Sequence, residues 1–137
     1  MKMKVIGYWA ITAFLAFAMV SGGAAELLRR PDNIDGLVRL GYPAYFASII
    51  GFWKVLGGLT VLAPRLPRLK EWAYAGIFFN MTGAAVSHAV SGDAAWHVIV
   101  TGALALLTVA SWALRPQSRS LGVLVPVERG RGNVTDA

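Results

Sequence analysis

Residues 5–25 contain no charged side chain, and this stretch restricts the possible folds more than any other feature of the chain. A helix rises about 1.5 Å per residue, so about 20 apolar residues match the thickness of a bilayer. Hydrophobic residues make up 56% of the chain and charged residues 15%, against about 25% charged in soluble domains. A signal peptide cleaved near Gly23-Ala24-Ala25 is the competing interpretation, but its apolar core would have only about 7–15 residues. We therefore interpret residues 5–25 as a membrane-spanning helix.

Three further apolar segments have the length of a membrane span: residues 42–63, 70–90 and 94–114. Tight turns at residues 64–68 and 91–93 make them sequential antiparallel neighbours. The only sizeable loop, residues 26–41, has apolar residues at helical spacing between Pro31 and Gly41, which indicates a short helix at the membrane interface. We expect an all-α protein, an antiparallel transmembrane four-helix bundle within residues 1–116, with a mobile cytoplasmic tail at residues 117–137.

The basic residues predict the orientation of the bundle. Three lie on the side of the first loop: Arg29, Arg30 and Arg39. Nine lie on the side of the N-terminus: Lys2, Lys4, Arg65, Arg68, Lys70, Arg115, Arg119, Arg129 and Arg131. By the positive-inside bias, both termini are expected in the cytoplasm. The net charge of +6 is scattered over helix ends rather than gathered into a patch, so nucleic acid is not an expected partner.

Small and polar residues share one side of three of the expected helices, and we expect these sides to face neighbouring helices. In the first helix they are Tyr8, Thr12, Met19, Gly23 and Glu26. In the second they are Ala47, Gly51, Lys54, Gly58 and Val61. In the third they are Ala73, Gly76, Asn80, Gly83, Ala84, Ser87 and Ser91, with Tyr74 nearly opposite as an interface residue.

Lys54 stands near the middle of the second helix. A charge at that depth costs about 2.5–3.5 kcal/mol, so Lys54 is expected to face the bundle interior, where Asn80 lies at nearly the same depth. The pair indicates a substrate, quinone or anion site, or a general base if burial lowers the pKa of the lysine. An interhelical tie without chemistry is the alternative.

Glu26, His88 and His97 are expected near the outer ends of their helices, close to Asp93 in the second tight turn. Such groups transfer protons near neutral pH, ligate metals, or hold a quinone or haem. We take Glu26, Lys54 and His88 as candidate catalytic residues. The candidate ligand-binding residues are Lys54, Asn80, His97 and Thr101. No metal site is predicted, because no short ligand spacing supports one.

Two other polar side chains have structural interpretations. Thr101 shares a helix face with His97, and a hydrogen bond to its own backbone is the alternative to a binding role. Glu71 lies in the first turn of the third helix, where a carboxylate is favoured, and it is expected to pair with Arg68.

The segment Glu71-Trp72-Ala73-Tyr74-Ala75-Gly76, followed by Ser87-His88, resembles the third helix of the DoxX-like membrane proteins. Residues 41–43 with 51–54 resemble the second helix of that family, and residues 112–116 resemble its last. The resemblance covers residues 4–116 and implies a four-helix membrane bundle. Some relatives are linked to quinone-coupled sulfur oxidation, and others resemble a chaperone of receptor assembly.

The function expected from these features is binding of a small hydrophobic or quinone-like ligand in a polar bundle interior, in the lipid bilayer, as a subunit of a membrane redox system. The chain has no cysteine, so redox chemistry would need a cofactor such as quinone or haem, or redox protein partners. A stand-alone membrane enzyme of the isomerase type and a non-enzymatic assembly factor stay open as alternatives, as does a homo-oligomer. A pocket that reaches Lys54 would favour ligand binding or catalysis, whereas a filled interior would favour the assembly factor.

Overall fold

The computed structural model describes residues 2–121, and these residues are helical with no β-strand among them. The helices are α1 (Lys2–Leu27), α2 (Pro31–Arg39), α3 (Phe46–Leu62), α4 (Pro67–Val90) and α5 (Ala95–Ala113), followed by a 3-10 turn at Gln117–Arg119. The expected all-α class is therefore confirmed. Most of the expected mobile tail, residues 122–137, lies outside the described residues.

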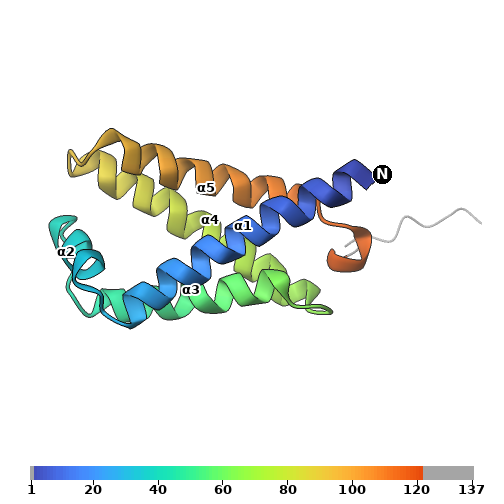
Figure 1. Cartoon of the computed structure of the whole chain (residues 1–137), viewed down its shortest axis with the longest axis horizontal. Coiled ribbons are helices and arrows are strands. Elements are labelled where there is room, and N and C mark those ends of the chain that lie inside the picture. Colours follow the sequence, from blue (N-terminus) through green and yellow to red (C-terminus); the bar gives the residue numbers. More distant parts are fainter. Residues whose placement is uncertain (1, 122–137) are drawn as a thin grey trace, which may run out of the picture.

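The four long helices form two closely packed pairs, α1 with α3 and α4 with α5, joined by contacts of α3 with α4 and of α1 with α5. At the end of the molecule that carries α2, the ends of α4 and α5 are separated from those of α1 and α3, and α2 lies between them (Figure 1). One apolar core joins the four long helices, and its buried members are Leu15, Ala16, Met19, Val61, Tyr74, Ile77, Met81 and Ala105.

The packing faces expected for α1 and α3 are the observed ones. The buried residues of α1 include Tyr8, Thr12, Met19, Gly23 and Glu26. Those of α3 are Ala47, Gly51, Gly58 and Val61. Glycine at positions 23, 51 and 58 leaves no side chain between the helices, so their backbones come into direct contact, as small residues allow between membrane helices.

The packing face expected for α4 is wrong. Its buried residues are Lys70, Tyr74, Ile77 and Met81, whereas a Cβ added to Gly76 or Gly83 would meet nothing within 4 Å. Tyr74 is only 3% exposed, so it is a core residue and not an interface residue. Tyr74 bonds Ser111 of α5 and Ile77 lies next to Gly57 of α3, whereas the positions of Gly76 and Gly83 face open space.

The segment between α2 and α3 also differs from the expectation. The chain leaves α2 through Gly41 at φ 93°, a backbone conformation that glycine adopts without strain. Turn hydrogen bonds then run from the amide of Phe46 to the carbonyl of Pro43 and from the amide of Ala47 to that of Ala44. Because residues 44 and 45 form a turn, α3 begins at Phe46 rather than at Tyr42.

Two helices, α1 and α5, are long and apolar enough to cross a membrane, and α3 is a shorter apolar helix. Large apolar side chains cover much of the exterior of the described chain; Phe17 is 71% exposed and Leu106 73%. Soluble monomers rarely expose apolar surface on this scale, whereas membrane proteins do so toward lipid.

A polar network crosses the interior at the end of the molecule away from α2. Ser111 of α5 lies 2.6 Å from the hydroxyl of Thr12 and 2.8 Å from that of Tyr74, and all three residues are buried. Each hydroxyl thereby gains a hydrogen-bond partner that the apolar surroundings do not offer. This network joins α1, α4 and α5.

Ionic contacts at the same end correct one expectation. Glu71 pairs with Arg115 at 2.6 Å and accepts a hydrogen bond from the indole of Trp112 at 2.8 Å, so its partner is not Arg68. Arg119, in the first part of the expected tail, donates to the hydroxyl of Tyr8 at 2.9 Å and to carbonyl groups at the end of α3. The chain is therefore tied to the helices as far as Arg119.

Candidate functional site

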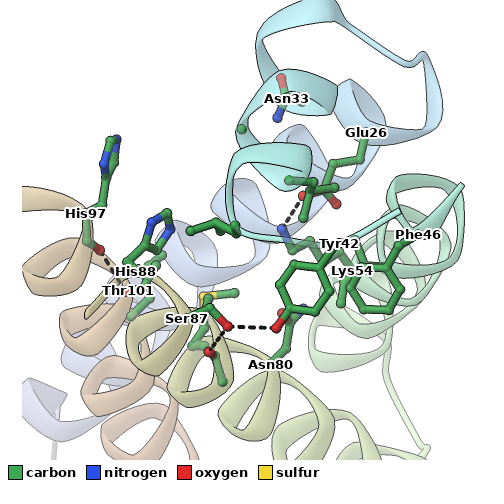
Figure 2. Close-up of a pocket in the computed structure, with 18 of the residues that line it drawn as sticks. Glu26, Asn33, Tyr42, Phe46, Lys54, Asn80, Ser87, His88, His97 and Thr101 are labelled. Atoms are coloured by element: carbon green, nitrogen blue, oxygen red, sulfur yellow. Dashed lines mark hydrogen bonds and ion pairs between the residues drawn. The ribbon is translucent and has the colours of Figure 1, made fainter. Parts of the chain in front are cut away.

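A cavity of about 510 Å³ opens where the two helix pairs separate, and it is lined by residues of all five α-helices and the turns between them. Its volume lies in the range of small-molecule sites, about 300–1,000 Å³. Every candidate residue from the sequence lines it: Glu26, Lys54, Asn80, His88, His97 and Thr101. Figure 2 shows these side chains around the cavity, with α2 along one side.

Glu26 and Lys54 form an ion pair at the wall of the cavity, with 2.6 Å between Oε1 and Nζ (Figure 2). Their side chains are only 8% and 15% exposed. The second carboxylate oxygen, Glu26 Oε2, is buried and has no hydrogen-bond partner within residues 2–121. A buried carboxylate oxygen without a partner is costly, so this atom is a ready acceptor for a hydrogen-bond donor in the cavity.

Lys54 faces the interior, as expected, but its partner differs from the expected one. The ammonium bonds Glu26, and within residues 2–121 no hydrogen bond joins it to Asn80. The contact of α1 with α3 determines this choice, because it brings Glu26 and Lys54 into reach of each other across the two helices. Asn80 lines the same cavity from α4.

A second, largely apolar hollow of about 590 Å³ lies between α3 and α4. It shares Ile50, Lys54 and Asn80 with the first cavity. Its other lining residues are mostly apolar or small: Trp53, Leu56, Gly57, Thr60, Leu69, Trp72, Ala73, Gly76 and Ile77. Lys54 and Asn80 therefore line both the first cavity, which contains the charged groups, and the largely apolar groove.

The two histidines lie at the opposite wall of the first cavity. Nδ1 of His88 is 2.7 Å and Nδ1 of His97 is 3.1 Å from the same oxygen, Asp93 Oδ2. The two rings stack with 5.0 Å between their centroids. The other oxygen of Asp93 accepts the amide hydrogen of Ala94 at 2.8 Å. The hydrogen bond from the Ala94 amide has the largest effect and the one with His88 the next largest. Both lower the pKa of Asp93 below its ordinary value of 3.8, so the carboxylate is ionised at neutral pH.

The expected outer cluster is thus divided into two groups that line one cavity. Glu26 belongs with Lys54, and the histidines belong with Asp93. The hydroxyl of Thr101 donates a hydrogen bond to the carbonyl of His97 at 2.7 Å, so its hydrogen is used within its own helix.

Sequence reasoning missed the residues that close the cavity on the side of α2. The hydroxyl of Tyr42 lies 2.7 Å from that of Ser87, its ring stacks on Phe46, and Asn33 of α2 lies nearby (Figure 2). Arg39 of α2 also lines the cavity. The helical spacing in residues 31–39 predicted α2 itself. No spacing pattern indicates that this short helix turns toward α4.

A sequence profile of the DoxX-like family matches residues 10–111 of this chain, a range that contains every residue of the two polar groups. No curated protein and no solved structure shows a significant similarity to it. The family is one of membrane proteins, in agreement with the two candidate spans and the apolar exterior. The chain belongs to the DoxX-like family.

Proposed function

We propose that α1, α3, α4 and α5 cross the inner membrane as an antiparallel four-helix bundle, with both termini in the cytoplasm and α2 at the outer surface. The distribution of basic residues supports the orientation. The five tryptophans support the proposed position of the bundle in the membrane. All five side chains are exposed, and four lie toward the ends of the long helices: Trp9, Trp72, Trp96 and Trp112. Tryptophan is enriched at membrane–water interfaces.

Within this bundle, the cavity binds a small hydrophobic molecule that carries a polar head. The observation that carries the proposal is the Glu26–Lys54 pair, a buried ion pair with a spare carboxylate oxygen at the wall of a ligand-sized cavity. Charges inside a membrane protein are rare and usually mark a ligand or ion site. A bound head group with both acceptor and donor atoms would satisfy Lys54 and Glu26 together.

The groove between α3 and α4 provides the place for the apolar part of the ligand. It meets the cavity at Lys54 and Asn80 and is otherwise largely apolar. A quinone-like molecule matches this division. Its carbonyl oxygens accept hydrogen bonds from ammonium and amide groups, a hydroxyl of its reduced form donates to Glu26 Oε2, and its tail is lipophilic. Such a ligand would enter from the lipid between α3 and α4.

The protein would take part in redox chemistry only through its bound ligand and a redox partner. The chain has no cysteine and therefore no thiol redox chemistry of its own, so electrons would pass between the bound quinone-like molecule and a cofactor or another subunit. A cavity that reaches Lys54 favours binding or acid–base catalysis over an assembly factor with a filled interior. Of the two, binding needs only the observed groups, and it is the function proposed here.

The experiment is a binding titration of the purified full chain in lipid nanodiscs with a short-chain benzoquinone, followed by quenching of tryptophan fluorescence. Gly83 lines the cavity and a Cβ added to it would meet nothing within 4 Å, so Gly83→Leu is the variant chosen to fill the cavity. Gly102→Leu is the matched control, since Gly102 also has open space but does not line the cavity.

Saturable binding by the wild type and by Gly102→Leu, together with loss of at least about 10-fold in affinity in Gly83→Leu, supports the proposal. A loss of that size corresponds to about 1.4 kcal/mol. Absence of saturable binding in the wild type, or equal affinity in all three proteins, overturns the assignment of a quinone-like ligand to this cavity.

A further inference from the structure

Three potential metal ligands converge at the turn between α4 and α5. Each of His88, Asp93 and His97 offers one ligand atom, and these atoms lie within 4.8 Å of one another. The three residues come from the last turn of α4, the connecting turn and the first turn of α5. Backbone hydrogen bonds fix this connection, among them the bond from the amide of Asp93 to the carbonyl of His88 at 3.0 Å.

The hydrogen-bonding groups of these three side chains do not all have partners. Both imidazoles direct Nδ1 at a single oxygen, Asp93 Oδ2. Nδ1 of His88 forms a hydrogen bond with it, whereas Nδ1 of His97 is buried and has no hydrogen-bond partner within residues 2–121. A cation among the three atoms would give His97 Nδ1 a partner, because an imidazole nitrogen without hydrogen is a lone-pair donor to metals.

We propose that His88, Asp93 and His97 form a binding site for a divalent first-row transition metal ion such as Zn²⁺. Two imidazoles and one carboxylate form a known ligand set for zinc and non-haem iron sites. Bonds of about 2.0–2.1 Å in a tetrahedron place ligand atoms about 3.3 Å apart. The two imidazole nitrogens lie 2.7 and 3.1 Å from Asp93 Oδ2, and all three ligand atoms lie within 4.8 Å of one another, so small side-chain rotations would produce the coordination geometry.

Three protein ligands leave a fourth position for water or for another molecule. All three residues also line the cavity that contains Glu26 and Lys54. An ion at this site would therefore lie at the cavity wall opposite the ion pair, and it could hold an oxygen atom of a bound molecule. The metal site itself does not depend on the proposed hydrophobic ligand.

Protein without a polyhistidine tag provides the test, with Zn²⁺ alone as the probe and isothermal titration calorimetry as the measurement. Trp96 gives a second signal, since its ring lies 4.6 Å from that of His97 and a bound paramagnetic Ni²⁺ ion should quench its fluorescence. Trp96→Phe should remove this quenching while leaving the calorimetric signal.

The ligand variants are His88→Ala, His97→Ala and Asp93→Asn, of which the last retains an oxygen for the amide of Ala94. Asp35→Asn on α2 is the matched control, since Asp35 does not line the cavity. Each ligand variant should lose at least the roughly 10-fold in affinity that even outer-shell partners of metal sites provide. The control should bind as the wild type does.

The double variant Glu26→Gln, Lys54→Met separates this proposal from the function proposed above. It should retain Zn²⁺ binding and lose the benzoquinone. One Zn²⁺ ion per chain that is lost in all three ligand variants supports the site. No binding by the wild type, or binding unchanged by His88→Ala and His97→Ala, overturns it whatever the result with the benzoquinone.

Discussion

Gly23 of α1 and Gly51 of α3 lie directly against each other, so that a Cβ added to either would stand 2.7 Å from the carbonyl oxygen of the other. The same contact brings together the residues three positions further along each helix: a Cβ on Gly51 would lie 2.9 Å from Cβ of Glu26, and one on Gly23 would lie 2.9 Å from Cβ of Lys54. The ion pair at the cavity wall is thus a consequence of two glycines.

The first prediction is that side chains at this contact destabilise the protein. Gly23→Ala and Gly51→Ala should each lower the free energy of unfolding by about 1–3 kcal/mol, because the backbones of α1 and α3 must move apart. Gly22→Ala is the control, since a Cβ at Gly22 meets nothing within 4 Å. Unfolding in mixed micelles measures the difference, and equal stability of Gly22→Ala and Gly23→Ala would contradict the close contact.

The second prediction concerns the energetic coupling of Glu26 and Lys54. Glu26→Gln and Lys54→Met each leave one charge unpaired in a buried site, which costs up to about 3–5 kcal/mol. The double variant leaves no charge, so the two losses should fall short of additive by about 0.5–3 kcal/mol. A cycle of Lys54→Met with Glu71→Gln is the control, because Glu71 pairs with Arg115 instead. Additive losses for Glu26 and Lys54 would show that the pair is not formed.

The faces of α1 and α3 could be predicted from sequence because their small residues really form a helix–helix contact. The same rule failed for α4. Small residues such as Gly76 and Gly83 permit close approach of a neighbour, but they equally permit an open space. Spacing along one helix does not distinguish the two outcomes, because the position of the neighbouring helix decides between them.

The sequence predicted which residues line the cavity, but it did not predict which of them form pairs with each other. Counting residues from helix ends placed Glu26, Lys54, Asn80 and the histidines at suitable depths, and all of them line one cavity. The pairing of Lys54 with Glu26 depends on the distance between α1 and α3. The depth of a residue along its own helix gives no information about that distance. The contributions of Tyr42 and α2 depend on a turn whose course the sequence pattern does not specify.

The third prediction concerns the buried network at Ser111. Ser111→Ala removes the partner of both Thr12 and Tyr74, whose hydroxyls are then buried without this hydrogen bond. The loss of stability should be about 1–3 kcal/mol. Ser21→Ala should have little effect, because the hydroxyl of Ser21 is exposed and bonds only a carbonyl of its own helix. Comparable stability of both variants in the same unfolding assay would refute the network.

The fourth prediction concerns orientation in the membrane. Single cysteines introduced at Asp35 and Ser118 provide unique labelling sites, because the chain has no cysteine of its own. An impermeant thiol reagent added to intact cells should label only the cysteine at position 35, and permeabilised cells should show labelling at both. Labelling of position 118 alone in intact cells would reverse the proposed topology.

The most direct measurement of the central claim is native mass spectrometry of the protein released from its own membrane in mild detergent. A cavity that holds a small hydrophobic molecule predicts a discrete added mass on the wild type and on Gly102→Leu, and no such mass on the cavity-filling variant Gly83→Leu. Wild-type protein released at the mass of the bare chain, or an added mass that persists undiminished in Gly83→Leu, would contradict the claim that this cavity is a ligand site.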